Sequence, residues 1–124
     1  MSTILIVEDN PKNMKLARDV LQAKGYTTLE AVNGEEGVRL ALQHKPDLVL
    51  MDIQLPDING IEAFRRIRAN AETAAVPIVA FTASVTANDL SRIDQAGFDA
   101  FIGKPINIKE FVATVQRVIE GGRK

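Results

Sequence analysis

Short apolar runs alternate with longer amphipathic stretches along the whole chain. Three runs, at residues 4–7, 48–51 and 78–81, are apolar without interruption, and two weaker β-prone pieces cover 26–31 and 98–102. A continuous apolar run of this length is typical of a strand covered on both faces, as in a parallel sheet. The pattern therefore predicts five strands.

Between the runs, apolar residues recur every three or four positions, which predicts amphipathic helices. Asn10 and Pro11 supply an N-cap residue and a proline at the first helical position, and Gly25 supplies the C-terminal stop. Asn33, three residues before Glu36, resembles a capping box and opens the next helix. These signals predict one helix after each of the first two strands.

Three further helices follow the remaining strands. One starts at Gly60, and the other two have capping pairs, Thr86 with Asp89 and Asn107 with Glu110. Regular alternation of strands and helices implies βαβ units, parallel strands and right-handed crossovers. We therefore predict an α/β, flavodoxin-like doubly wound (βα)5 fold, with a five-stranded parallel sheet in the order 2-1-3-4-5 and helices on both faces.

Composition and charge narrow the classes of function. The chain has 124 residues, 46% of them apolar and 25% charged, which suits a single globular domain over 1–124. A formal net charge of −1 argues against nucleic-acid binding, and the absence of cysteine excludes disulfides and thiolate chemistry. No apolar run approaches the roughly 20 residues that span a bilayer, and no basic region precedes the first strand. We expect no membrane insertion and a cytoplasmic location.

The predicted strands end on polar side chains. In the order 2-1-3-4-5 the first and third strands are neighbours, so Glu8, Asp9 and Asp52 should converge. Thr82 and Lys104 end the fourth and fifth strands at the same edge. Three close carboxylates repel one another, so at least one pKa should rise unless a cation joins them. A ligand set made of oxygen atoms favours Mg²⁺ over a transition metal.

Taken singly, these side chains have ordinary explanations: the acids as a helix cap or solvated loop, the threonine as a local hydrogen bonder, the lysine as a surface charge. Four of the five predicted strands end on such groups at one edge, however, which favours a common site. A carboxylate is a nucleophile toward phosphorus, and a hydroxyl and an ammonium can bind phosphoryl oxygens. The pattern thus favours phosphoryl chemistry at Asp52, with catalysis by positioning and charge neutralisation.

The same residues carry a resemblance to a known family. The chain is similar to the receiver domains of two-component response regulators over essentially all of its length. The matching pieces are Val7-Glu8-Asp9-Asn10, Met51-Asp52-Ile53-Gln54-Leu55-Pro56, Gly60, Thr82-Ala83 and Lys104-Pro105. The resemblance implies that Asp52 is the phospho-acceptor. It also implies that Glu8 and Asp9 hold Mg²⁺ (or Mn²⁺), Asp9 directly, and that Asp52 and the main-chain carbonyl of Gln54 complete the metal shell.

The ends of the fourth and fifth strands gain roles from the same resemblance. Thr82 and Lys104 would bind phosphoryl oxygens, and the Lys104–Pro105 peptide bond would be cis. Thr82 and Phe101 would act as switch residues, with a phenylalanine where a tyrosine would bring a hydroxyl group. The variable positions that tune phosphoryl lifetime in this family fall on Gln54 and two residues after Thr82.

The function implied by the resemblance is phosphorelay signal transduction. A sensor histidine kinase or a histidine phosphotransferase would donate the phosphoryl group, and phosphorylation would change a face used to bind a downstream protein. That face is built by the helix after Thr86, the strand over 98–102 and the last helix. With no output domain expected, the chain resembles a stand-alone, chemotaxis-messenger or DivK-like regulator, and a fragment of a hybrid kinase stays open. We expect no turnover of a separate substrate, and hence no enzyme in the usual sense.

Three other functions compete with this one. Aspartate-nucleophile phosphatases need a second acid two residues after the nucleophile, where this chain has Gln54. Flavin- and nucleotide-binding modules need a Gly- or Ser/Thr-rich phosphate loop after the first strand, whereas residues 8–11 include two acids. A degenerate receiver acting only as a scaffold stays open, although the complete set of acids, threonine and lysine argues against it.

The remaining charged residues have simpler interpretations. Asp57 lies past the end of the third strand and is interpreted as a solvated turn residue. His44, the only histidine, is interpreted as a surface residue near a helix end rather than a phosphocarrier. Arg65, Arg66 and Arg68 are interpreted as a solvated helix face rather than a contact patch.

Overall fold

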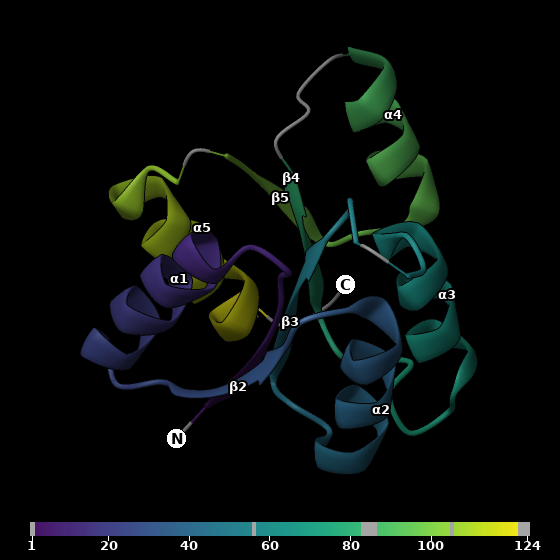
Figure 1. Ribbon diagram of the computed structural model, residues 1–124, viewed down its shortest axis with the longest axis horizontal. Helices are drawn as coiled ribbons and strands as arrows, with labels where there is room; N and C mark the ends of the chain where they lie inside the picture. Colours follow the sequence, from purple (N-terminus) through teal and green to yellow (C-terminus); the bar gives the residue numbers. More distant parts are fainter. Residues whose placement is uncertain (1, 56, 83–86, 105, 122–124) are drawn as a thin grey trace.

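The computed structural model describes residues 2–55, 57–82, 87–104 and 106–121. Strands and helices alternate through these ranges, as Figure 1 shows. In chain order they are β1 Thr3–Val7, α1 Pro11–Ala23, β2 Thr27–Ala31, α2 Gly34–His44, β3 Leu48–Asp52, α3 Gly60–Ala69, β4 Ile78–Thr82, α4 Ala87–Ala96, β5 Ala100–Gly103 and α5 Ile108–Gly121.

The sheet is parallel throughout and has the order β2-β1-β3-β4-β5, which confirms the predicted doubly wound fold. Helices α1 and α5 cover one face, and α2, α3 and α4 cover the other (Figure 1). Each face therefore has its own apolar layer. One layer packs α1 and α5 against the sheet, and the second packs α2, α3 and α4 against the opposite side.

Strand β3 lies at the centre of the sheet, and all five of its residues are buried. Leu48 and Leu50 join the layer under α1 and α5, whereas Val49 and Met51 join the layer on the other face. Successive side chains of a strand point to opposite faces, so an uninterrupted apolar run fills both layers at once. The interpretation of this run as a strand covered on both sides is confirmed.

Most helix starts follow the predicted capping signals. The side chain of Asn10 accepts hydrogen bonds from the amides of Lys12 and Asn13, and that of Asn107 accepts one from Glu110. The predicted pair of residues 86 and 89 lies outside what the structure describes.

The capping box of α2 differs from the predicted pattern in one detail. Asn33 accepts from the amide of Glu36, as predicted, at 2.8 Å. The Glu36 carboxylate, however, accepts from the amide of Val32, not from the cap residue itself. Helix α3 has a cap that was not predicted, because Asn59 accepts from the amide of Glu62.

Two glycines set how closely helices approach the strand ends. A Cβ on Gly60 would lie 2.3 Å from the carbonyl oxygen of Asp52, so only glycine lets α3 begin directly against the end of β3. The amide of Gly60 also donates to the carbonyl of Ile53 at 2.9 Å. In α2, a Cβ on Gly37 would lie 2.8 Å from a methyl group of Val7, at the end of β1. Both helices are therefore seated tightly against the strands that carry acids.

Two details of the C-terminal third differ from the sequence prediction. The fifth strand begins at Ala100 rather than at residue 98, because Phe98 instead packs on Phe64 with ring centroids 4.3 Å apart. The helical spacing of Ile108 with Phe111 and Val115 predicts that it lies on the apolar stripe of the last helix, but it is 53% exposed. It is the first residue of α5, one turn before the stripe meets the sheet.

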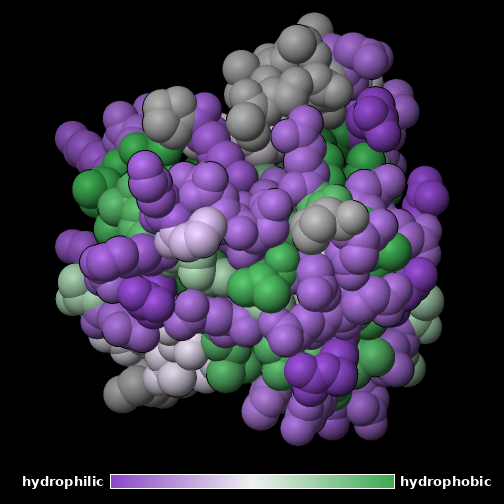
Figure 2. Space-filling model, in the orientation of Figure 1, coloured by the Kyte–Doolittle hydropathy of each residue, from purple (hydrophilic) through white to green (hydrophobic). Residues whose placement is uncertain are grey.

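Figure 2 shows the surface of the molecule in the orientation of Figure 1. This surface is largely hydrophilic, and apolar side chains are visible on it in small separate patches. Within the described ranges, no helix is long and apolar enough to cross a bilayer, in agreement with the apolar runs of the sequence.

Candidate functional site

The carboxyl ends of the strands bring the predicted side chains together. Asp52 and Thr82 are the last residues of β3 and β4, and Lys104 comes directly after β5. Glu8 and Asp9 follow β1, which pairs with β3. One ligand atom from each of the three acids lies within 4.8 Å of the others. The predicted convergence is therefore observed.

The Lys104 ammonium joins two of these acids. Its Nζ lies 2.6 Å from Oε1 of Glu8 and 3.1 Å from Oδ2 of Asp52. The same Nζ lies 4.7 Å from the ring centroid of Phe81, so the ring face borders the charge. Because the main-chain amide of Lys104 donates to the carbonyl of Thr82 at 2.8 Å, the lysine is anchored at both ends.

Main-chain amides hold the remaining carboxylate oxygens. Oδ1 of Asp52 accepts from the amide of Gln54 at 3.0 Å, and Oε2 of Glu8 accepts from the amide of Asn10 at 3.2 Å. Glu8 and Asp52 are buried, whereas Asp9 is exposed. The site thus has two fixed carboxylates in its floor and a third at its mouth.

The charges of this cluster do not balance without a further cation. Burial and the neighbouring Glu8 carboxylate raise the pKa of Asp52 to about 7. Burial also raises the pKa of Glu8, but its hydrogen bonds to Asp52 and Lys104 outweigh that effect and lower it. Three acidic groups and one ammonium leave room for a hard cation with oxygen ligands, so the residues present fit Mg²⁺.

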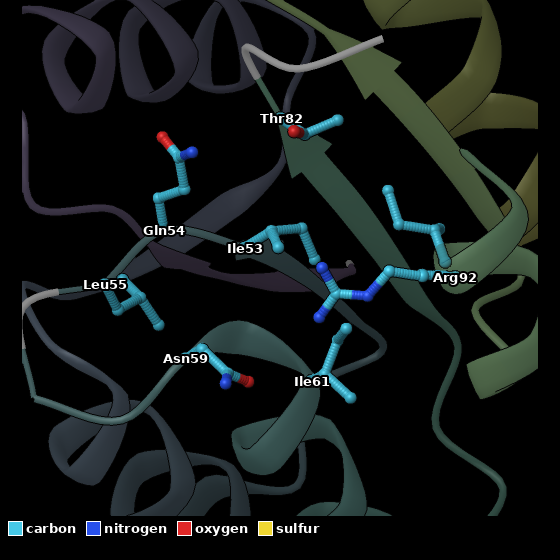
Figure 3. Close-up of a pocket in the computed structure, with 8 residues that line it drawn as sticks. Ile53, Gln54, Leu55, Asn59, Ile61, Thr82 and Arg92 are labelled. Atoms are coloured by element: carbon cyan, nitrogen blue, oxygen red, sulfur yellow. The ribbon is translucent and has the colours of Figure 1, made fainter. Parts of the chain in front are cut away.

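A cavity of about 300 Å³ opens beside the cluster, and Thr82 and Gln54 line the part nearest to it. Figure 3 shows Arg92 reaching from α4 across this cavity toward Ile61 of α3, with Ile53 beside it. Thr82 is buried, whereas the side chain of Gln54 is exposed. The sequence did not predict this cavity, because α3 and α4 each contribute only isolated residues to its lining and these residues form no recognisable motif.

The predicted switch aromatic, Phe101, is 46% exposed on β5. It lines a different cavity of about 350 Å³, whose other walls include Lys104, Asn107 and Glu110. Phe101 pairs in register with Ala80 of β4, two residues before Thr82. The predicted cis peptide bond involves Pro105, which lies outside the described residues.

Asp57 is exposed in the loop after β3, as predicted, but its carboxylate also has a structural role. Its carboxylate accepts from the amides of Gly34 and Glu35 at 2.8 and 2.9 Å, at the first turn of α2. Partial desolvation raises the pKa of Asp57, but these backbone hydrogen bonds outweigh it and lower the pKa overall. The loop that carries Gln54 is therefore tied to α2, a contact over 22 positions that local sequence patterns do not reveal.

The interpretation of Arg68 as part of a solvated face was wrong. Arg68 forms an ion pair with Asp99 at 2.9 Å, with both side chains largely buried, and donates to the carbonyl of Val76. Arg66 pairs with Glu62 and Glu35 at the surface, and His44 is exposed in the last turn of α2, as predicted.

Comparison with known proteins gives one consistent family. The model of the response regulator receiver domain matches residues 4–116. The polar-differentiation response regulator DivK of Brucella anthropi is 44% identical over 114 residues, which cover 92% of this chain and 93% of that protein. DivK of Brucella ovis is 43% identical over the same shares.

Solved structures agree with the sequence comparisons. The receiver domain of a sensor histidine kinase from Pseudomonas aeruginosa PAO1 superposes with a TM-score of 0.90 at 36% identity, over 96% of this chain and 98% of that one. That crystal structure has a magnesium ion coordinated in its active-site cleft. The signal receiver domain of a histidine kinase from Syntrophus aciditrophicus superposes with a TM-score of 0.89 at 30% identity, over 98% and 92% of the two chains.

Proposed function

Because this chain belongs to the family of response regulator receiver domains and acts in two-component phosphorelay signalling, we propose that its Asp52 accepts the phosphoryl group. The position of this carboxylate is the observation that carries the proposal. Asp52 is buried at the end of the central strand, with Oδ2 on an ammonium and Oδ1 on a main-chain amide. Both oxygens are thus held at the carboxyl ends of the strands by partners that the chain itself supplies.

In the proposed transfer, an Asp52 oxygen attacks the phosphorus of a phosphohistidine on a donor protein. The new O–P bond forms as the P–N bond breaks, and the imidazole of the donor leaves with the electron pair and takes up a proton. Lys104 moves from pairing with Asp52 to pairing with a phosphoryl oxygen, and Thr82 donates its hydroxyl hydrogen to another. Such positioning and charge neutralisation account for most of the catalysis in phosphoryl transfer.

Glu8, Asp9, Asp52 and the carbonyl of Gln54 are the groups that would hold Mg²⁺, with Mn²⁺ as an alternative hard ion. The bound ion would supply charge neutralisation for the phosphoryl oxygens. The acidic cluster and the raised pKa of Asp52 support this assignment. The one further reaction that we assign is hydrolysis of the chain's own aspartyl phosphate. We assign no turnover of a separate substrate, because Gln54 occupies the position of the second acid that a phosphatase needs.

We propose that the response travels from Thr82 to Phe101 and changes the face formed by α4, β5 and α5. Phe101 is 46% exposed, and the cavity of about 350 Å³ lies beside it. Turning the ring into that cavity would remove apolar surface from water, which is favourable. The phosphodonor would be a sensor histidine kinase or a histidine phosphotransferase. The output would be a contact with a downstream protein in the cytoplasm.

Incubation with acetyl phosphate and Mg²⁺, followed by intact mass spectrometry, tests the proposal. The expected result is one added phosphoryl group that is lost in Asp52→Asn and when EDTA is present. Asp94→Asn is the matched control, because Asp94 is an exposed aspartate on α4 that should leave the reaction unchanged. Phosphorylation that persists in Asp52→Asn would place the chemistry on another residue.

A further inference from the structure

Two adjoining cavities form a continuous cleft between α3 and α4. The first, of about 300 Å³, lies beside the loop after β3, and the second, of about 430 Å³, runs along the two helices. Both are lined by Asn59, Ile61 and Arg92, so one opens into the other. We call the two together the α3–α4 cleft. Their volumes fall at the lower end of the range of ligand sites in proteins.

Apolar side chains line the inner part of the cleft. Ile53 and Leu55 from the loop after β3 and Ile61 from α3 are partly exposed there, and Ile93 of α4 is buried behind them. Figure 3 shows Ile53, Leu55 and Ile61 around the same opening. An apolar side chain of a partner would remove this surface from water at about 25 cal/mol per Å².

Two arginines line the outer part of the cleft. Arg92 reaches over the apolar floor from α4, and Arg65 faces the second cavity from α3. Within the described ranges neither guanidinium has an ion-pair partner, and the carboxylate of the nearby Glu62 is paired with Arg66 instead. The cleft therefore presents uncompensated positive charge on a chain whose net charge is −1.

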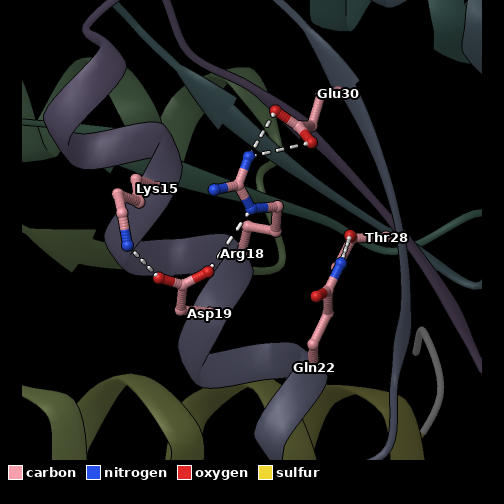
Figure 4. Close-up of polar contacts among 6 residues, drawn as sticks. All are labelled: Lys15, Arg18, Asp19, Gln22, Thr28 and Glu30. Carbon is pink, nitrogen blue, oxygen red and sulfur yellow. Dashed lines mark hydrogen bonds and ion pairs between the residues drawn. The ribbon is translucent and has the colours of Figure 1, made fainter.

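Several other arginines in the described ranges are compensated internally, although Arg117 on α5 forms no ion pair there. Arg18 contacts Glu30 and Asp19, as Figure 4 shows, and Arg68 is paired with Asp99. Arg39 pairs with Glu36 on α2. The cleft differs in having two unpaired guanidinium groups along the same cavity, a feature that internal stability does not explain.

We propose that the α3–α4 cleft is a docking site for an acidic segment of a partner protein, in which a carboxylate lies next to a large apolar side chain. The carboxylate would pair with Arg65 or Arg92, whose planar fork matches a carboxylate in a bidentate arrangement. The apolar side chain would enter between Ile53, Ile61 and Ile93. Arginine beside apolar surface is the composition that interface hot spots favour.

The cleft shares α4 with the face assigned to signalling output, but it lies on the side of α4 that meets α3. Among the residues that the structure describes, none that lines the cavity of Phe101 also lines the cleft. The inner end of the cleft does include Thr82 and Gln54, which border the acidic cluster. A segment bound there would touch the residues that surround Asp52, and so binding and the state of the site would influence each other reciprocally.

Titration of the ¹⁵N-labelled protein with two synthetic peptides tests the proposal, without Mg²⁺ or phosphodonor. The probes are acetyl-Asp-Leu-Phe-Asp-amide and its neutral analogue acetyl-Asn-Leu-Phe-Asn-amide. The acidic peptide should shift the amide signals of Ile61, Arg65, Arg92 and Gln95. It should also bind at least about tenfold more tightly than the neutral one, as expected for a charge-assisted hydrogen-bonded pair.

Variants assign the effect to the arginines. Arg65→Ala and Arg92→Ala should each weaken binding of the acidic peptide several-fold, and Arg92→Lys should weaken it less because the charge remains. Arg117→Ala, an exposed arginine on α5 outside the cleft, is the matched control and should leave binding unchanged. Equal binding of both peptides, the same loss in Arg117→Ala, or identical shifts with sodium acetate alone would overturn the proposal.

Discussion

At the scale of single residues, the Asp52 carboxylate lies beside a second buried carboxylate, that of Glu8, and one ammonium, that of Lys104, faces both. The pKa of Asp52 is raised to about 7 by burial and by Glu8, whereas in an unfolded chain it is about 3.9. Between these values the folded state binds more protons than the unfolded state. The free energy of unfolding therefore falls as pH rises through this window, and the loss is complete above about pH 7.

Asp52→Asn should consequently stabilise the metal-free protein at alkaline pH. We expect its free energy of unfolding to exceed that of the original chain by about 2 kcal/mol at pH 8, because the uncompensated charge is removed. The difference should shrink toward pH 4. Urea denaturation in EDTA at both pH values measures it, with Asp94→Asn as control. The pKa of Glu8 is lowered, so its own contribution falls at lower pH. A pH-independent difference would contradict the explanation.

At the same scale, Gly60 determines whether α3 can begin against the end of β3. Gly60→Ala should lower the free energy of unfolding by about 3 kcal/mol, because its Cβ would meet a main-chain carbonyl that cannot move aside. Gly121→Ala is the control, since a Cβ there meets nothing within 4 Å and alanine suits a helix better. Thermal denaturation of the two variants should separate them, and similar melting temperatures would show that α3 can shift.

At the scale of elements, the ion pair of Arg68 with Asp99 joins the end of α3 to the segment before β5. Asp99 also accepts from the amide of Ile78 at 2.8 Å, and Arg68 lies 5.0 Å from the ring centroid of Phe64. The end of α3, the start of β4 and the segment before β5 thus meet at the amino ends of the strands, opposite the acidic cluster. The contact spans 31 positions of sequence, so no local pattern announces it.

Breaking this pair from one side should be costly. Arg68→Met leaves the Asp99 carboxylate largely buried without its counter-ion, and we expect a loss of about 3 kcal/mol in the free energy of unfolding. Arg68→Met combined with Asp99→Asn should recover part of that loss. Arg65→Met, on the exposed face of the same helix, should change stability by no more than about 0.5 kcal/mol. Urea denaturation compares the three, and equal effects of Arg65→Met and Arg68→Met would refute the interpretation.

At the scale of the whole molecule, a ligand that binds only the folded state stabilises it. Mg²⁺ at a hundred times its dissociation constant should raise the free energy of unfolding by about 2.7 kcal/mol. Because the ion competes with the proton on Asp52, the effect should weaken as pH falls below about 7. Thermal denaturation with and without MgCl₂ at pH 8 and pH 6 measures both effects. Stabilisation that persists in Asp52→Asn would place the ion elsewhere.

Much of the architecture was predictable because two periodicities alternate clearly along the chain. The strand order, the burial of β3 and the meeting of Glu8, Asp9 and Asp52 follow from that alternation and from the geometry of parallel sheets. The tie from Asp57 to α2 was not predictable, because it depends on loop conformation rather than on a repeated pattern. The α3–α4 cleft was missed for a related reason: single residues of two helices build it, and only their packing brings them together.

The central position of β3 has a consequence for hydrogen exchange. The backbone of β3 is hydrogen-bonded to β1 on one side and to β4 on the other, and all its side chains are buried. Its amides should therefore exchange only when the whole domain opens. The carboxylate proposed as the acceptor is thus attached to the segment that we expect to exchange most slowly. A phosphoryl group placed there would leave the exchange protection of β3 nearly unchanged, and its effect would be recorded in the amides of the surrounding loops and helices.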